Sequence, residues 1–135
     1  MDKKFDVIIV GTGAAGLYAA LNFPESVNIL LVSKRELQLS NSSLAQGGVA
    51  CVLDTVHDSY KLHITDTLIA GKYKNTLSAV EKLVTEGPSD VLKIKDLGVD
   101  FDLNEDGTMC KTLEAGHSRN RIVHHKDSTG KAIVD

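Results

Sequence analysis

Three glycines, Gly11, Gly13 and Gly16, follow an apolar run from Phe5 to Val10, and a helical pattern begins directly after them. This G-x-G-x-x-G spacing between a strand and a helix constrains the fold more than any other feature. The first glycine permits a tight turn, the second lets the backbone approach a pyrophosphate, and the third lets helix and strand pack closely. The sequence therefore predicts a dinucleotide-phosphate site, where free N–H groups and the helix dipole attract an anion.

Two other interpretations of the glycine run are weaker. A Walker-type phosphate loop needs Lys and then Ser or Thr after its last glycine, and Leu17 and Tyr18 stand there instead. A turn without any ligand is the remaining alternative, because glycine is common in turns. The strand before the glycines and the helix after them favour phosphate binding over a plain turn.

Residues 27–32 predict a second strand, after a break at Pro24. Strand, helix and strand form one βαβ unit, whose right-handed crossover makes the two strands parallel. Sites of this kind place Asp or Glu after the second strand to hold the ribose hydroxyls, whereas this chain has Ser33 and Lys34. We expect these two to contact the adenosine side and Glu36, which lies past the strand, to be a solvated loop charge. The missing acid argues against a soluble NAD enzyme.

A polar loop runs from Leu39 to Val49 and contains a pair of glycines near its end. Four consecutive hydroxyl and amide side chains suit a segment that lies against a polar ligand. An exposed, turn-rich loop has the same composition. The composition alone does not decide between the two.

Helical periodicity covers residues 58–98. The first helix is expected to begin with Asp58 as its N-cap and to end at Gly71. On its apolar face, His63 is expected to be a hydrogen-bonded packing residue rather than a ligand. This segment predicts packing and no chemistry of its own.

Two more helices are expected over residues 75–86 and 89–98, because Gly87 and Pro88 interrupt the pattern. The residues expected on their buried faces are Leu77, Val80, Val84, Val91, Ile94 and Leu97. A strand and a turn at Asp106-Gly107 then predict a short hairpin. The aspartates around it do not form a calcium loop, because no bidentate Glu follows at the required offset.

The stretch from Thr112 to Lys126 is the other chemically dense segment, with one Glu, three His and two Arg. Small residues follow Glu114, which would let a substrate approach the backbone. A metal site is disfavoured because the adjacent pair His124-His125 points apart in regular structure and no Cys or carboxylate completes a set. A solvated basic loop is the alternative interpretation.

The length, charge and cysteine content of the chain limit the classes of protein to which it can belong. With 135 residues and a formal net charge of -3, the chain has the size of one domain and no global attraction for nucleic acid or a membrane surface. No apolar stretch approaches the ~20 residues of a membrane span, and no signal peptide is evident, so we expect a cytoplasmic protein. Cys51 and Cys110 fit no metal spacing and predict reduced thiols. Because only two parallel strands are evident, the chain is expected to be the N-terminal part of something larger.

Several motifs, in the same order, resemble a known flavoprotein family. GTGAAGL, VSK, AQGG, HITDTLIAG, LGVDFD and EAGHSRNRIVHHKDSTG are similar to the family of succinate dehydrogenase, fumarate reductase and L-aspartate oxidase. The last motif is most similar to the L-aspartate oxidase branch. The resemblance runs from end to end of the chain and implies that it is the first part of such a flavoprotein.

The resemblance implies an α/β fold, namely the N-terminal part of a Rossmann-like FAD-binding domain with a βαβ unit, packing helices and a short β-hairpin. The implied organisation is an incomplete FAD-binding domain over residues 1–135. Within it we expect a phosphate site at 5–34, a flavin loop at 39–50, a helical segment at 58–98, and a hairpin with a substrate-side loop at 99–135.

The cofactor that the resemblance implies is FAD. The implied cofactor-binding residues belong to the turn, the end of the second strand and the polar loop: Gly11, Thr12, Gly13, Ala14, Ala15, Gly16, Ser33, Lys34, Asn41, Ser42, Ser43, Leu44, Ala45, Gln46, Gly47 and Gly48. Succinate dehydrogenases attach FAD through a His in this loop, and Asn41 stands at that position here. An amide cannot form the bond, so a non-covalent, dissociable FAD is expected.

The L-aspartate oxidase branch implies oxidation of L-aspartate to iminoaspartate, with oxygen or fumarate as electron acceptor, in the quinolinate route to NAD. Glu114 matches the residue that helps accept an amino dicarboxylate, because a carboxylate pairs with an ammonium and repels succinate. His117 and Arg121 are implied to shape the same site. The family's catalytic residues would lie after Asp135, so the chain alone is expected to be inactive. Quinolinate synthase is the implied partner that uses the product.

Two rival functions remain. One is a soluble fumarate reductase flavoprotein, of which this chain would be a fragment, and Glu114 argues against it. The other is a non-catalytic nucleotide-binding module that is complete at 135 residues. A substrate panel distinguishes a fumarate reductase from an L-aspartate oxidase. The length of the encoding reading frame distinguishes a complete nucleotide-binding module from a fragment of a flavoenzyme.

Overall fold

The computed structural model describes residues 3–135; residue 1, where the expected domain begins, lies outside them. The chain forms two compact units. The first consists of the chain up to Gln46 together with Ser128–Asp135, and the second of Gly47–Asp127. Within the described residues, no helix has the length and apolar character needed to cross a membrane.

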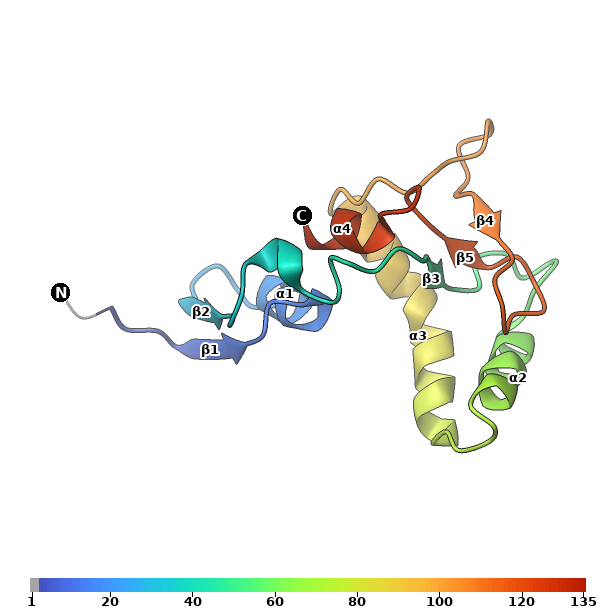
Figure 1. The fold of residues 1–135 in the computed structure, drawn as a ribbon, viewed down its shortest axis with the longest axis horizontal. Helices are drawn as coiled ribbons and strands as arrows, with labels where there is room; N and C mark the ends of the chain where they lie inside the picture. Colours follow the sequence, from blue (N-terminus) through green and yellow to red (C-terminus); the bar gives the residue numbers. More distant parts are fainter. Residues whose placement is uncertain (1–2) are drawn as a thin grey trace. The chain divides into compact units, whose positions relative to one another are not determined.

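The first unit contains the parallel βαβ arrangement (Figure 1), made of β1 (Val7–Val10), α1 (Ala14–Leu21) and β2 (Ile29–Val32). The two strands pair in parallel over their full length, from Val7 opposite Ile29 to Val10 opposite Val32. This confirms the predicted unit. The second strand begins at Ile29, two residues later than expected.

A short 3₁₀ helix, η1 (Leu37–Leu39), and a C-terminal helix, α4 (Thr129–Val134), complete the first unit. The backbone N–H of Gly130 in α4 donates to the carbonyl of Ala45 at 3.0 Å. A Cβ at Gly130 would lie only 2.0 Å from the carbonyl oxygen of Ser42. A glycine is therefore what allows α4 to lie against the polar loop.

The second unit contains an antiparallel sheet in the order β3-β5-β4, from β3 (Val49–Ala50), β4 (Lys111–Thr112) and β5 (Ile122–Val123). Its core is formed by Cys51, Val91, Phe101, Met109 and Val123. The predicted hairpin is present, because Leu103 and Met109 form an antiparallel bridge and Gly107 turns the chain with φ +80. Together with the βαβ unit, this confirms the expected α/β class.

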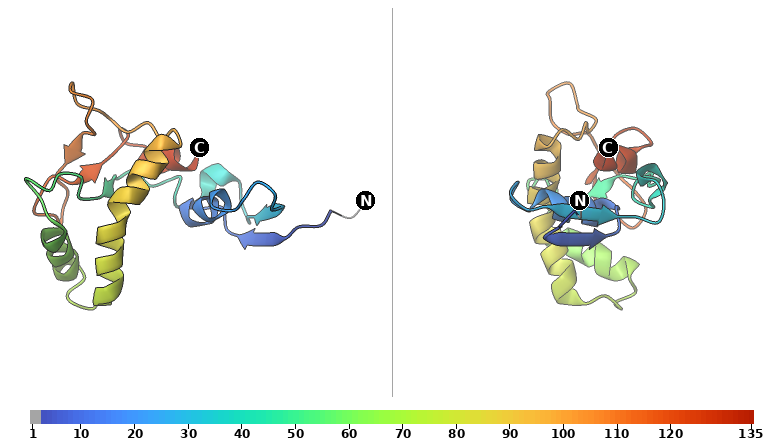
Figure 2. Two further views of the ribbon diagram at one scale, coloured as in Figure 1. Left: turned by 180° about the vertical axis from the view of Figure 1, so that it is seen from behind. Right: turned by 90° about the vertical axis from the view of Figure 1, so that its left-hand side faces the viewer.

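Helices α2 (Tyr60–Ala70) and α3 (Leu77–Asp96) lie side by side in the second unit (Figures 1 and 2). The predicted N-cap of α2 was wrong by one residue. Ser59 caps the helix, with its Oγ accepting from the N–H of Leu62 at 3.2 Å. Asp58 precedes Ser59, and its carboxylate binds Arg121. Gly71 ends the helix as predicted.

The prediction of two helices around Pro88 was also wrong, because α3 is one helix with Pro88 inside it. Pro88 is buried and shares one face with Val80, Val84 and Val91, which are buried as well. Burial of this continuous apolar face stabilises the helix by more than the hydrogen bond that the proline removes. The Ser89 hydroxyl donates to the Glu86 carbonyl at 2.8 Å, which satisfies one carbonyl near the proline. Leu77 and Leu97, at the two ends, are exposed rather than buried.

The buried thiol of Cys51 gives a direct test of the second unit's core. Cys51 is 1% exposed, and desolvation raises the pKa of its thiol to about 12. Because the thiolate is the reactive form, we expect Cys51 of the full-length protein to resist alkylation by iodoacetamide until the protein is unfolded in urea. Mass spectrometry of the Cys51 peptide measures this, and rapid labelling of the native protein would contradict the buried position.

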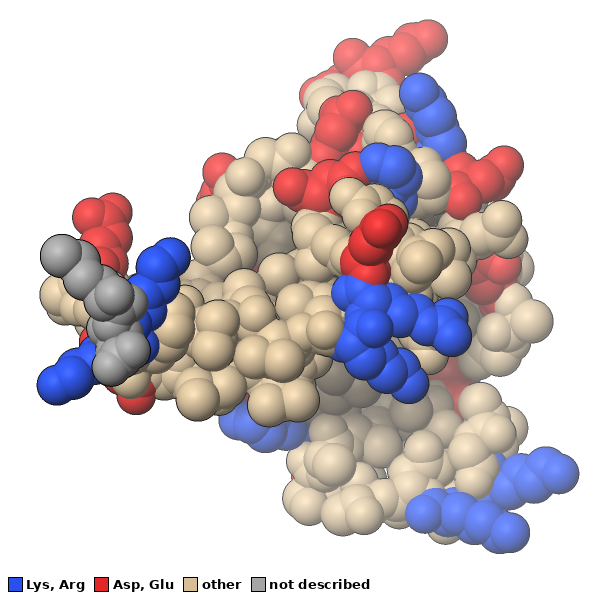
Figure 3. Space-filling model, turned by 60° about the vertical axis from the view of Figure 1, so that its left-hand side comes forward, with Lys and Arg blue, Asp and Glu red and all other residues tan. Residues whose placement is uncertain are grey.

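Apolar side chains remain exposed on the strands of the first unit, notably Ile8 at 63% and Val10 at 84%. Parallel strands are normally covered on both faces, so this sheet lacks the covering that such strands usually have. In the space-filling view of Figure 3, charged residues of both signs lie scattered and uncharged residues fill broad areas between them.

Candidate functional site

The glycine turn of the first unit is built as the spacing predicts. Gly11 adopts φ +112, a region that favours glycine, and its N–H donates to the carbonyl of Val32 at 2.8 Å. A Cβ at Gly16 would lie 2.0 Å from the carbonyl oxygen of Gly11. The first glycine is therefore required by its positive φ, and the third by the close contact between α1 and the turn.

The start of α1 offers backbone donors to an anion. Gly13 is the N-cap and has no side chain to satisfy them. Ala14 N–H donates to Ser42 Oγ at 3.1 Å, whereas no acceptor within residues 3–135 is recorded for the N–H groups of Ala15 and Gly16. Two free donors at the positive end of a helix fit a phosphate oxygen. The turn therefore fits the pyrophosphate of a dinucleotide.

The polar loop is folded tightly beside this turn. Ser40 accepts from the N–H of Ser43 at 3.1 Å through its Oγ, and from the N–H of Leu44 at 3.1 Å through its carbonyl. Ser42 holds the loop to α1 through its bond with Ala14, and Gly13 leaves just enough room for it, since a Cβ there would be 3.0 Å from Ser42 Oγ. The loop is thus held in place beside the glycine turn.

The remaining predicted cofactor contacts are exposed or have a packing reason of their own. Ser33 and Lys34 are exposed after β2, and Ser33 Oγ accepts from the N–H of Arg35. Gly48 belongs to the second unit, where a Cβ would lie 2.3 Å from the carbonyl oxygen of Val123. Asn41 is exposed. Their roles toward a cofactor stay predictions.

The second unit contains a buried ion pair that the sequence did not predict. Arg121 has a fully buried side chain, with 0% exposure. Its Nε and Nη2 donate to the two carboxylate oxygens of Asp58, each at 2.8 Å, and its Nη1 donates to Asp66 Oδ2 at 2.6 Å. Two carboxylates thus surround one guanidinium, in a fork geometry that suits Arg and not Lys.

Asp66 and Arg121 also anchor residues 114–118, the segment that was predicted to face a substrate. Asp66 Oδ2 also accepts from the N–H and from the Oγ of Ser118, both at 2.8 Å. Arg121 Nη1 lies 3.1 Å from His117 Nδ1, and the N–H of His117 donates to the Glu114 carbonyl at 3.2 Å. Glu114, His117 and Arg121 are therefore connected through one network.

Burial alone would raise the pKa of both carboxyl groups. For Asp58, hydrogen bonds from Arg121 and from the N–H of Ser59 outweigh the burial and leave the pKa below its ordinary value. For Asp66, hydrogen bonds from Arg121 and Ser118 have the same net effect on the pKa. Both groups are ionised in the folded protein near neutral pH.

His63 lies next to this network. Its ring centroid is 5.6 Å from that of His117. The residue is 6% exposed, which agrees with packing, but the expected hydrogen bond is not seen at its Nδ1, which has no partner in the part of the chain that the structure describes. Burial, followed by the positive charge of Arg121, lowers the pKa of His63 to about 4. His63 is therefore neutral at physiological pH.

Glu114 itself is exposed on the loop before His117, and no ion pair is recorded for it among the described residues. Arg121, by contrast, is enclosed by Asp58 and Asp66, so it offers no free charge to a ligand. The structure thus separates the two residues by accessibility, although the resemblance implied both of them for the same site.

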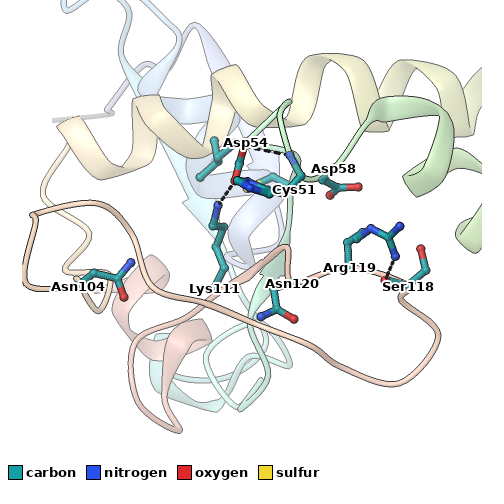
Figure 4. A pocket seen from close by; sticks show the side chains of 10 residues that line it. Cys51, Asp54, Asp58, Asn104, Lys111, Ser118, Arg119 and Asn120 are labelled. Atoms are coloured by element: carbon teal, nitrogen blue, oxygen red, sulfur yellow. Dashed lines mark hydrogen bonds and ion pairs between the residues drawn. The ribbon is translucent and has the colours of Figure 1, made fainter.

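A pocket of about 410 Å³ lies in the second unit (Figure 4). It is lined by side chains of both charges and by amides, among them Lys111, Arg119, Asn104 and Asn120. Asp54 lies at its wall, with Oδ2 3.5 Å from Lys111 Nζ and 2.8 Å from the ring of its neighbour His57. The charges here are largely paired with one another.

Asp58 and Asp66 are the site residues that the sequence analysis missed. A weak signal was available for Asp66, because it follows His63 by three positions and therefore shares a helix face with it. No signal was available for Asp58, since its partner lies far along the chain in Arg121.

Comparison with protein families identifies the fold just described. A family model described as "FAD binding domain" matches residues 6–135. The chain belongs to this family of FAD-binding domains.

Several relatives of this FAD-binding domain are named L-aspartate oxidases. The chain is 47% identical to the L-aspartate oxidase of Clostridium perfringens over 135 residues, covering 100% of this chain and 30% of that protein. It is 45% identical to the one from Nostoc over 132 residues, covering 98% of this chain and 22% of that protein. The chain therefore spans less than a third of the length of these relatives.

Solved structures of flavoproteins share the fold. Sdh1 of Mycobacterium smegmatis, in complex with UQ1, matches with a TM-score of 0.89 at 31% identity, covering 96% of this chain and 22% of that one. Quinol fumarate reductase FrdA of E. coli also matches with a TM-score of 0.89, at 28% identity, covering 96% and 23% of the two chains. The FAD-binding domain thus has the fold of the succinate dehydrogenase and fumarate reductase flavoproteins.

Proposed function

We propose that this chain is the FAD-binding segment of an L-aspartate oxidase, which oxidises L-aspartate to iminoaspartate with oxygen or fumarate as the electron acceptor. In this proposal the product enters the quinolinate route to NAD, with quinolinate synthase as the next enzyme. The observation that carries the proposal is the 47% identity over all 135 residues to an L-aspartate oxidase, against 28% and 31% to the fumarate reductase and succinate dehydrogenase chains.

Bound FAD would supply the acceptor for a hydride from the substrate's α-carbon and would return the electrons to oxygen or fumarate. The N–H groups of Ala15 and Gly16 would hold its pyrophosphate at the positive end of α1. Ser33 and Lys34 would contact its adenosine side, and the loop from Asn41 to Gly48 would contact the ribityl chain and flavin without a covalent bond. The free donors and the tight glycine approach support this assignment.

Glu114 would recognise the ammonium group of L-aspartate. It is an exposed carboxylate without an ion-pair partner among the described residues, so it has a charge to offer. Succinate lacks an ammonium and would meet the same negative charge unfavourably. Glu114 would therefore select the amino dicarboxylate.

The first test is a substrate panel with the full-length protein. FAD binding is measured by the quenching of flavin fluorescence, and reduction by the bleaching of the flavin under anaerobic conditions. We expect saturable, dissociable FAD and bleaching by L-aspartate but not by succinate. Bleaching by succinate alone would favour a fumarate reductase, and FAD binding with no reduction by either would favour a non-catalytic module.

The E114Q variant is expected to lose specificity for L-aspartate. A hydrogen bond to a charged group contributes about 1.5–3 kcal/mol, so we expect kcat/KM for L-aspartate to fall by roughly 10- to 150-fold, with FAD affinity unchanged. E105Q, at an exposed position in the hairpin turn, is the matched control and should retain full activity. Equal kcat/KM values in E114Q and the unsubstituted protein would exclude this role.

A further inference from the structure

The guanidinium of Arg121 faces an imidazole as well as two carboxylates. Its Nη1 donates to Asp66 Oδ2 at 2.6 Å and lies 3.1 Å from His117 Nδ1. The bidentate bond to Asp58 fixes the plane of the guanidinium, because Nε and Nη2 both donate to it at 2.8 Å. The Nη1 hydrogens therefore have a set direction, one of them toward His117.

The chemistry of this contact decides the tautomer of His117. A guanidinium carries only donors and does not lose its proton in proteins. Its partner must accept, so His117 Nδ1 carries a lone pair and the ring proton sits on Nε2. No described residue is recorded as a partner of His117 Nε2, and that atom is not among the buried unpartnered ones.

We infer that Arg121 is a positioning residue that fixes His117 as the Nε2–H tautomer, so that His117 presents a hydrogen-bond donor to an oxygen of a bound ligand beside Glu114. In this inference Arg121 shapes the site through His117, because its own side chain is fully buried between two carboxylates. The identity of the ligand rests on the proposed function, but the tautomer does not.

The surroundings of His117 favour a fixed donor. Asp66 holds Ser118, the next residue, by two hydrogen bonds at 2.8 Å, so the backbone at His117 is anchored. On the other side, the neutral ring of His63 packs at 5.6 Å between centroids. The N–H of His117 donates to the carbonyl of Glu114 at 3.2 Å, which joins the two residues in one turn.

Together, Glu114 and His117 offer an acceptor for an ammonium and a donor for an oxygen. This pairing suits an amino acid zwitterion, in which the ammonium and the α-carboxylate are close together. A carbonyl oxygen of the cofactor has the same acceptor chemistry. The shared requirement is an oxygen acceptor within reach of His117 Nε2.

The first experiment reads the tautomer directly in the full-length protein. Histidine labelled with ¹⁵N, observed by long-range ¹H–¹⁵N correlation at neutral or slightly basic pH, separates protonated from unprotonated ring nitrogens, and H117Q identifies the His117 signals. We expect an unprotonated Nδ1 and a protonated Nε2, and in R121K a shift of both nitrogens toward averaged values, because Lys cannot reproduce the fork. A protonated Nδ1 in the unsubstituted protein would overturn the inference whatever the substrate is.

The second experiment uses a matched pair of variants, H117N and H117Q. Asn places its amide near the position of Nδ1 and leaves the distal donor out, whereas Gln reaches the position of Nε2. We expect H117N to raise KM for L-aspartate or Kd for FAD by roughly tenfold, about 1.4 kcal/mol, and H117Q to stay within a few-fold. A change in KM for L-aspartate would indicate that a substrate oxygen accepts from His117, and a change in Kd for FAD would indicate that a cofactor oxygen does. Equal values for both variants and the unsubstituted protein, or equal losses in both variants, would show that His117 only packs.

Discussion

Replacing Arg121 by methionine is expected to destabilise the second unit by about 3–5 kcal/mol, because it leaves two buried carboxylates without a cationic partner. Asp58 and Asp66 have side-chain exposures of only 5% and 12%. Methionine fills a similar volume, so loss of packing is a smaller part of the effect. Native-state hydrogen exchange of the peptides that contain α2 and β5 in the full-length protein measures the local free energy of opening.

The effect of R121M should depend on pH, with a sign that follows from the two carboxyl groups. Their pKa values in the folded protein lie below the ordinary 3.8. The stability that they contribute is therefore fully present above that value and is lost as the pH falls through the folded pKa values. In R121M, burial raises the pKa of both groups, so protonation relieves the variant. The difference between the two proteins should narrow as the pH falls toward 3.8.

A surface ion pair serves as the control for this prediction. Lys82 and Glu86 on α3 form a pair at 2.7 Å, but their side chains are 71% and 57% exposed. K82M should cost no more than about 0.5 kcal/mol. A difference between R121M and the unsubstituted protein that is as small as that of K82M, or that is constant down to acidic pH, would contradict the role assigned to the ion pair.

Replacing Gly16 by valine is expected to abolish high-affinity FAD binding. A Cβ at this position would lie 2.0 Å from the backbone carbonyl oxygen of Gly11, and neither atom belongs to a flexible side chain. Helix α1 must then shift away from β1, which moves the free N–H groups of Ala15 and Gly16. We expect FAD affinity to fall by at least about tenfold and stability by about 1–3 kcal/mol, measured by fluorescence titration and thermal unfolding of the full-length protein.

Gly87 offers a matched control, because a Cβ there would meet nothing within 4 Å. It lies inside α3, where alanine is favoured over glycine by roughly 0.5–1 kcal/mol. G87A should therefore leave FAD binding unchanged and slightly raise the unfolding temperature. FAD affinity in G16V equal to that in G87A would refute the proposed position of the phosphate site.

The sequence was most informative where the physics is local. The spacing of Gly11, Gly13 and Gly16 predicted the turn, because Gly11 supplies a positive φ and Gly16 allows the close contact between helix and turn within one βαβ unit. The Asp106-Gly107 turn was predictable for the same reason. In both places the chain needs only its near neighbours to adopt the observed geometry.

The predictions failed where a distant partner overrides a local rule. Pro88 was expected to interrupt the helical pattern, but it lies inside α3, where the buried face that it shares with Val84 and Val91 stabilises one continuous helix. Asp58 was expected to cap α2, but its carboxylate binds Arg121. Neither outcome is visible in a window of a few residues, since both depend on tertiary packing.

The contact between Gly130 and Ala45 has a consequence for how the protein is made. The first unit consists of two chain segments separated by the whole of the second unit. A ribosome synthesises the chain from its N-terminus. The contact between Ala45 in the polar loop and Gly130 in α4 can therefore form only after all of Gly47–Asp127 has emerged. The continuous second unit can therefore form first during synthesis, and the first unit closes only afterwards.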